Sequence, residues 1–147
     1  MRILFVTHHL SYADHIAIAH LSAVAKERGH LTYFCTLVPE RFCRTGLLEA
    51  IDAVLPHVVA YSVNVMGFQH AVAAQREACQ RHSFVSILGG PQATFSPETF
   101  TASGMDAYCV GEGELAFGDF LDRVEHGLPY DDVPNLTTKM GVNPVRP

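Results

Sequence analysis

The sequence lacks the features that mark several classes of protein. It has no cluster of lysine and arginine and carries a formal net charge of −5, so we expect no nucleic-acid partner. No apolar stretch is as long as a membrane span. The apolar run in the N-terminal segment MRILFVTHHL is too short for a signal peptide and is better explained as a strand. Together these absences predict a cytoplasmic protein.

The cysteines also exclude more than they indicate. The chain has four of them, and no two form a CxxC or CxxxC pair. Neither a zinc knuckle nor an iron–sulfur cluster is therefore expected. A disulfide framework does not suit a core of this size, so we expect reduced and mostly buried thiols.

What is present is a regular alternation of strands and helices within 147 residues, enough for one core. Five runs rich in β-branched and aromatic residues lie at 3–7, 31–36, 58–62, 84–88 and 107–110. The first, third and fourth are almost continuously apolar, which is typical of parallel strands covered on both faces. Helical segments are expected at 13–28, 68–81 and 113–126, with a short helix at 41–50. The pattern predicts an α/β fold with a doubly wound, five-stranded parallel sheet in the flavodoxin-like, Rossmann-like order 2-1-3-4-5, and helices on both faces.

The last stretch differs from the rest. Residues 129–147 contain four of the chain's eight prolines and no amphipathic helix, although 135–139 fits a strand followed by a turn at Met140-Gly141. We therefore expect an α/β domain over residues 1–128 and a proline-rich exit segment or linker over residues 129–147.

Ligands of open α/β sheets bind at the carboxyl ends of the strands, so the loops that leave those ends form the candidate site. The first loop and the helix start behind it supply polar and aromatic candidates, namely Thr7, His8, His9, Ser11, Tyr12, Asp14 and His15. This loop has no acidic cluster of a response regulator, no GxGxxG of a dinucleotide-binding domain and no Ser/Thr-rich phosphate loop of a flavodoxin. Its histidine spacing does not fit zinc binding from one helix face, and solvated loop histidines remain the alternative.

The loop after the third strand supplies Ser62, Val63, Asn64, Val65 and Met66. A serine at the end of a buried strand either donates a hydrogen bond to a ligand or caps the helix that follows. The sequence leaves both roles open.

The loop after the fourth strand begins the segment LGGPQATFSPETF and supplies Gly89, Gly90, Pro91, Gln92, Ala93 and Thr94. Two glycines in succession allow a flat group to lie against the backbone, because neither has a Cβ atom. A tight turn is the alternative. Further along, Ser96, Pro97 and Glu98 predict an N-cap, a first-turn proline and an early acidic residue of a helix.

The loop after the fifth strand supplies Gly111, Glu112, Gly113 and Glu114. Its carboxylates would repel a phosphate, so it is not a phosphate loop. The glutamates also suit a helix N-terminus, where they stabilise the helix without any further role.

Two of these segments together resemble the cobalamin-binding domain of the B12-dependent radical S-adenosylmethionine enzymes. That family typically shows GGPH-A-T, followed by an acidic and aromatic strand that ends in GEGE. Here GGPQAT matches with Gln92 in place of histidine, and DAYCVGEGE matches the second motif. The helix HIAIAHLSAVAKERGH and the tail VPNLTTKMGVNPVRP also resemble corresponding segments, so the resemblance covers nearly the whole chain.

The resemblance implies that cobalamin lies across the carboxyl ends of the strands, with its nucleotide tail beside the sheet. By that analogy Ser62 and Asn64 lie near the tail, and the tail's base packs against Gly89 and Gly90. The loop at 7–15 and the GEGE segment would border the corrin. A large macrocycle with amide side chains needs backbone partners and close approach more than charge, which suits such loops.

Two departures from related patterns limit what this chain is expected to do. The Asp-x-His-x-x-Gly motif that supplies a lower cobalt ligand elsewhere is not met, since Asp14 and His15 are adjacent. We expect base-off cobalamin without coordination from this loop. Coordination of cobalt by His8, His9 or His15 is the alternative. The cluster motif CxxxCxxC is absent, so the chain as given is not expected to be catalytic.

The implied parent is a methyltransferase or cyclase whose radical SAM core, in cis or missing, binds S-adenosylmethionine and a 4Fe-4S cluster. Two other hypotheses stay open at this point. One is a stand-alone cobalamin sensor or carrier. The other is a flavodoxin-like module that binds another small ligand.

Overall fold

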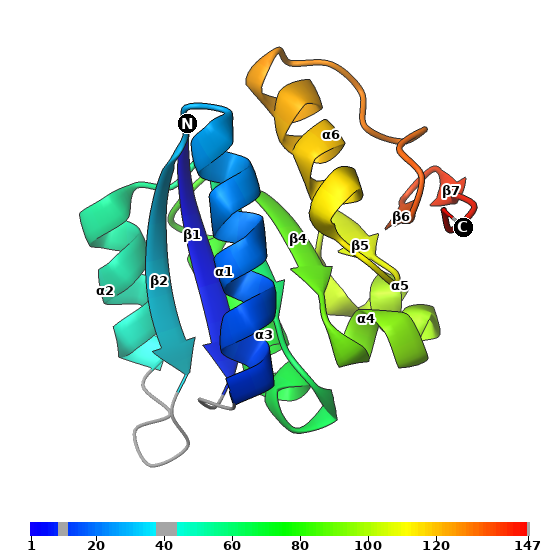
Figure 1. The fold of residues 1–147 in the computed structure, drawn as a ribbon. Coiled ribbons are helices and arrows are strands. Elements are labelled where there is room, and N and C mark those ends of the chain that lie inside the picture. The colour runs from blue at the N-terminus through cyan, green and yellow to red at the C-terminus, as the bar shows by residue number, and fades with distance from the viewer. Residues whose placement is uncertain (9–11, 38–43, 147) are drawn as a thin grey trace.

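A seven-stranded sheet forms the centre of the molecule (Figure 1). The computed structural model describes residues 1–8, 12–37 and 44–146. Five strands are parallel and follow the predicted order β2-β1-β3-β4-β5. Their bounds are β1 (Arg2–His8), β2 (Leu31–Leu37), β3 (Val58–Ser62), β4 (Val85–Gly89) and β5 (Ala107–Cys109). The chain order reverses between β1 and β3, which are neighbours in the sheet, so the switch point lies there.

Helices cover both faces of the sheet, as predicted (Figure 1). Helices α1 (Tyr12–Glu27) and α6 (Glu114–Glu125) pack on one face, where Phe5, Phe117 and Phe120 contribute to the core. Helices α2 (Arg44–Val54) and α3 (Val65–Ala78) pack on the other, around Leu4, Val6 and other apolar side chains. The short α4 (Pro91–Phe95), η2 (Pro97–Thr99) and α5 (Phe100–Ser103) follow β4. Alternate residues of each strand thus serve two separate apolar layers.

The prediction of a five-stranded, wholly parallel sheet was wrong in two respects. Two further strands, β6 (Leu136–Thr138) and β7 (Gly141–Val142), extend the sheet beyond β5, and both pair antiparallel. The residues expected to form an exit segment therefore add to the sheet. After β5 the chain forms α6 and comes back to the outer edge of β5 in the opposite direction, so β6 pairs antiparallel there, and a tight turn then brings β7 beside β6.

Two helix starts differ from the sequence expectation. Asn64, not Ser62, caps α3, because its side-chain oxygen accepts hydrogen bonds from the backbone N–H groups of Met66 and Gly67 at 3.0 and 3.2 Å. In the loop after β4 a helical turn already begins at Pro91, ahead of the predicted start. Ser96 makes no side-chain cap hydrogen bond to the 3₁₀ turn that follows it.

Candidate functional site

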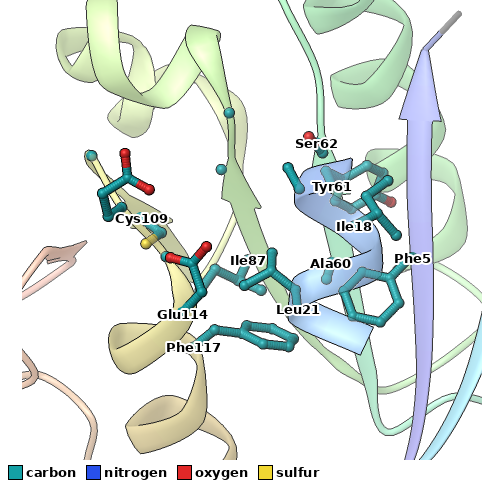
Figure 2. Close-up of a pocket in the computed structure, with 16 residues that line it drawn as sticks. Phe5, Ile18, Leu21, Ala60, Tyr61, Ser62, Ile87, Cys109, Glu114 and Phe117 are labelled. Carbon is teal, nitrogen blue, oxygen red and sulfur yellow. The ribbon is translucent and has the colours of Figure 1, made fainter. Parts of the chain in front are cut away.

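A cavity of about 130 Å³ opens between α1, α6 and the carboxyl end of the sheet (Figure 2). It spans the switch point, since both β1 and β3 contribute to its wall. Its deeper part is lined by apolar side chains, namely Phe5, Ile18, Leu21, Ala60, Ile87 and Phe117. Its mouth is lined by the ends of three strands and the loop before α6, namely Ser62, Gly89, Gly90, Gly111, Glu112, Gly113 and Glu114. We call these two sets the floor and the mouth.

The cavity exists because a small residue lies between two large ones on the same sheet face. In the strand register Ala60 of β3 is paired with Phe5 of β1 on one side and Ile87 of β4 on the other. All three side chains belong to the layer under α1 and α6. A methyl group cannot fill the space that its neighbours span, so the layer is left open next to the ligand edge.

The two adjacent glycines of this edge have different structural reasons to be glycine. Gly90 has φ +81° and ψ −166°, a backbone conformation that residues with a side chain rarely adopt. A Cβ there would also lie 3.1 Å from the Ser62 hydroxyl oxygen. Gly89 has an ordinary φ, and a Cβ there would meet nothing closer than 3.9 Å, at Cys109. The backbone turn therefore explains Gly90, whereas the bare wall of the cavity is the feature that Gly89 supplies.

The loop from Gly111 to Glu114 is held from two sides. Gly111 has φ +78°, and its N–H donates to the Thr94 hydroxyl at 3.1 Å, which joins the loops after β4 and β5. Glu114 begins α6, and the Phe117 N–H donates to the Gly113 carbonyl at 2.7 Å, which closes the first turn of that helix. The loop thus presents its backbone and two carboxylates to the mouth of the cavity in a fixed conformation.

Asn135 is the residue of this region that sequence reasoning missed. It is buried, has φ 70°, and its side-chain amide donates to the carbonyls of Val110 and Glu112 at 2.9 and 3.2 Å. Its side-chain oxygen accepts from the backbone N–H of Arg146 at 3.0 Å. Asn135 therefore ties the tail to the loop at the mouth. The only signal in the sequence was an asparagine directly after a proline, ahead of the short strand Leu136–Thr138.

Polar contacts connect the two helices that flank the cavity. His20 of α1 lies 3.6 Å from a carboxylate oxygen of Glu114 in α6, at the mouth. Arg28 at the far end of α1 pairs with Asp122 at 3.1 Å, and its guanidinium passes over Gly118, where a Cβ would lie 2.5 Å away. These contacts fix the spacing of α1 and α6, and with it the width of the cavity.

The thiol of Cys109 also lines the cavity. Burial raises its pKa to about 12, and the nearby Glu114 carboxylate adds to the shift. The group is therefore a neutral thiol at physiological pH and acts as part of the apolar wall rather than as a nucleophile.

The structure distributes the predicted residues of the first loop over different places. Thr7 is buried. The His8 ring lies on the sheet face that α3 covers, away from the cavity, and stacks with His70 of α3 at 6.2 Å between ring centroids. A Cβ at Gly67 of α3 would overlap the His8 side chain, so the two are in close contact. His9 and Ser11 lie outside the described residues. Tyr12, Asp14 and His15 belong to the first turn of α1, and the description does not extend to their side chains.

Several predicted residues of the other loops serve the scaffold. Val63 and Ala93 are buried in the layer under α2 and α3. Gln92 is buried, with its N–H donating to the Val63 carbonyl at 3.1 Å. Pro91 opens α4, while Val65 and Met66 are exposed at the start of α3. Ser62 and the two pairs of glycines, with the two glutamates, are the predicted residues that the fold brings together around the cavity.

Searches of the described residues for two other features were negative. No group of three or more histidine, cysteine, aspartate or glutamate side chains in them is arranged to hold a metal ion. Within the same residues, no helix is long and apolar enough to cross a membrane. Coordination of cobalt by His8, His9 or His15 stays a prediction.

The fold and the cavity define a Rossmann-like α/β domain with a ligand site at the switch point of its sheet. The sequence model described as B12 binding domain matches residues 4–121, so the chain belongs to the B12-binding domain family. The predicted resemblance is thereby confirmed. No curated protein matches the sequence.

Solved structures share the fold at low sequence identity. The chain is similar to the radical S-adenosylmethionine methyltransferase TsrM from Kitasatospora setae, solved with tryptophan substrate and a SAM analogue, with a TM-score of 0.81, 16% identity, and coverage of 100% of this chain and 30% of that one. A TsrM structure with cobalamin and a 4Fe-4S cluster bound gives a TM-score of 0.78, 16% identity, and 99% and 29% coverage. The apo form of the cobalamin-dependent S-adenosylmethionine radical enzyme OxsB gives a TM-score of 0.75 at 16% identity, and the match covers 98% of this chain and 22% of that one. The chain spans less than a third of the length of each.

Proposed function

We propose that this domain binds cobalamin at the carboxyl edge of its sheet and receives the base of the nucleotide tail in the cavity between α1 and α6. The observation that carries the proposal is the cavity itself, which has an apolar floor at the switch point and a wall left bare at Gly89. A flat aromatic base fits a site with apolar walls and no side chain on one of its sides. The residues present therefore suit the cofactor that the family model names.

The polar groups at the mouth suit the more polar parts of the same cofactor. The Ser62 hydroxyl lies at the end of β3, next to Gly90, and is placed to donate a hydrogen bond to the tail. The loop from Gly111 to Glu114 offers backbone groups and carboxylates, which accept hydrogen bonds from amide side chains. When bound, cobalamin would supply a cobalt centre able to carry an alkyl group. The chain's own part is to bind and orient the cofactor and to keep water from its tail.

We further propose that the domain serves a larger B12-dependent radical SAM enzyme of the methyltransferase or cyclase type. Supporting this, the two solved enzymes named above share its fold over almost its full length while extending well beyond it. S-adenosylmethionine and a 4Fe-4S cluster would then be bound by a separate core domain. Residues 129–147 would form the connection to that domain, and β6 within this segment also pairs with β5. A cytoplasmic location remains a prediction.

Titration of the purified 147-residue chain with hydroxocobalamin tests the proposal. We expect about one corrin per chain to be retained after desalting, measured by its visible absorbance. Loss of all corrin absorbance on desalting would contradict cobalamin binding. The spectrum of the complex, compared with those of His8→Ala, His9→Ala and His15→Ala, reports whether one of these imidazoles coordinates cobalt.

A matched pair of variants tests the place of binding. Ala60→Leu fills the floor of the cavity and is expected to weaken cobalamin binding while preserving the fold. Ala74→Leu adds the same atoms to the packed layer under α3, where it overpacks the core without reaching the cavity. Weaker binding in both variants, in proportion to their loss of stability, would show that the cavity is not the tail site.

A further inference from the structure

The floor and the mouth of the cavity differ sharply in polarity. The floor side chains of Phe5, Ala60, Ile87 and Phe117 contain no nitrogen, oxygen or sulfur atom. The strand backbone beneath Phe5, Ala60 and Ile87 belongs to the hydrogen-bonded parallel ladder, since Ala60 of β3 is paired with Phe5 of β1 on one side and with Ile87 of β4 on the other. Among the polar side chains of the lining, Ser62 lies toward the strand ends (Figure 2), and Glu114 begins α6 on the wall of the cavity. A group that reaches the floor therefore meets hydrocarbon and, on the wall beside it, the neutral thiol of Cys109.

The size of the cavity fixes how much of a base reaches that floor. It measures about 130 Å³. In another protein, an apolar cavity of about 150 Å³ admits one benzene molecule. One six-membered ring thus fills the floor, and the second ring of a bicyclic base lies closer to the mouth. In both benzimidazoles and purines the five-membered ring is the one joined to the ribose, so the six-membered ring is the part that goes deepest.

We propose that this cavity selects corrinoids by the base of their nucleotide tail, accepting benzimidazole-type bases and disfavouring purine-type bases. The inference rests on the proposed function and adds the specificity of the same site. The six-membered ring of dimethylbenzimidazole presents only carbon and two methyl groups, which match the floor. The six-membered ring of adenine presents two ring nitrogens and an exocyclic amine, which lose their hydrogen bonds to water and gain none from Phe5, Ile87 or Phe117.

The expected discrimination is large enough to measure. One buried polar group left without a partner weakens binding by about tenfold to a hundredfold. Three corrinoids separate the contributions: cobinamide, which has no base; cobalamin; and the analogue whose base is adenine. We expect the 147-residue chain to bind cobalamin at least about tenfold more tightly than the adenine analogue, with the adenine analogue close to cobinamide. Isothermal titration with each of the three measures this.

The possible outcomes distinguish the inference from the function on which it rests. If cobalamin and the adenine analogue bind equally tightly and both exceed cobinamide, the tail is bound but the floor does not select, and the inference is overturned. If all three bind equally, the tail does not enter the cavity at all, which also overturns it while leaving corrinoid binding intact. If none binds, the proposed function fails as well.

Variants at one partly exposed lining residue locate the selectivity. Leu21→Asn places an amide in the floor and is expected to narrow the preference for cobalamin by improving binding of the adenine analogue. Leu21→Met keeps the floor apolar and is expected to retain a preference for cobalamin over the adenine analogue. Thermal melting confirms that both variants are folded. Ala60→Leu, with the floor filled, is expected to bind cobalamin and the adenine analogue alike. A preference that persists undiminished in Ala60→Leu would place the selectivity elsewhere and overturn the inference.

Discussion

The two adjacent glycines after β4 are predicted to respond to substitution in opposite ways. Gly90 has φ +81° and ψ −166°, and a Cβ there would lie 3.1 Å from the Ser62 hydroxyl oxygen. A residue with a side chain held in such a region costs about 1–3 kcal/mol. For a domain of this size that corresponds to a lowering of the melting temperature by roughly 3–10 °C. Gly90→Ala is therefore expected to be a stability variant.

Gly89→Val is expected to be a binding variant. The backbone at Gly89 needs no left-handed conformation, and a Cβ there would lie 3.9 Å from Cys109, at an ordinary contact distance. The strand end accepts a β-branched residue, so the melting temperature of the free chain should change little. The added methyl groups enter the wall of the cavity, where a clash with a bound base costs about 1–3 kcal/mol, or about tenfold to a hundredfold in cobalamin affinity.

Two measurements on both variants and the parent chain test these expectations. Thermal melting of the free chains gives the loss of stability, and titration with hydroxocobalamin gives the loss of affinity. We expect Gly90→Ala to lower the melting temperature more than Gly89→Val does, and Gly89→Val to weaken cobalamin binding more than Gly90→Ala does. If Gly89→Val melts far below the parent chain, the space beside Cys109 is not available and the assignment of Gly89 to the cavity wall is refuted. If it binds cobalamin as the parent does, the tail lies elsewhere.

Three further predictions concern groups around the site and at the opposite edge of the sheet. Asn135→Gly removes two side-chain hydrogen bonds to the loop at the mouth, each of which contributes about 1 kcal/mol to stability. Asn135→Ala removes the same bonds and adds about 1–2 kcal/mol of backbone strain, because φ at this position is 70°. The free energy of unfolding in denaturant should therefore be lower for Asn135→Ala than for Asn135→Gly, and lower for both than for the parent chain. With a pKa of about 12, Cys109 should resist alkylation at pH 8 far longer than the exposed Cys79, as peptide mapping by mass spectrometry would show; equally fast labelling would contradict its burial. Burial lowers the pKa of His30 below its ordinary value of 6.5, so as the pH falls the unfolded chain takes up a proton before the folded chain does. The free energy of unfolding should therefore decrease as the pH drops below about 6.5. In His30→Gln, which lacks this titrating group, the decrease should be less steep.

The arrangement of the first four strands was predictable because each has five or more residues and so shows a pattern, and the three-residue β5 lies within the apolar and aromatic run predicted at 107–110. The almost continuous apolar runs at 3–7 and 58–62 became β1 and β3, with both faces covered by helices. A parallel strand needs a crossover, and the helical segments between the runs supplied one each time. Right-handed crossovers and the rule that ligands bind at carboxyl ends then brought the loops with Ser62, Gly89 and Gly111 to one edge.

The sequence indicated a strand at 135–139 followed by a turn, but it did not predict that this strand would join the sheet or pair antiparallel. Strands β6 and β7 have three and two residues, which is too short for periodicity to register. Pairing of β6 with β5 and of β7 with β6 holds the two strands in place. The side-chain amide of Asn135 adds hydrogen bonds to residues more than twenty positions away in the sequence. A tail rich in proline therefore resembled a linker in sequence.

By itself the sequence determined that this chain would form a Rossmann-like sheet, and its GGPQAT and GEGE segments marked the edge where a cofactor belongs. The tertiary structure alone decided where the cavity lies. It follows from the register that sets Ala60 between Phe5 and Ile87, and from the backbone of Gly90, which separates its role from that of Gly89. The physical reason is that a cavity is the space left between side chains from distant segments. Such a space has no pattern in one dimension, whereas a strand or a helix does.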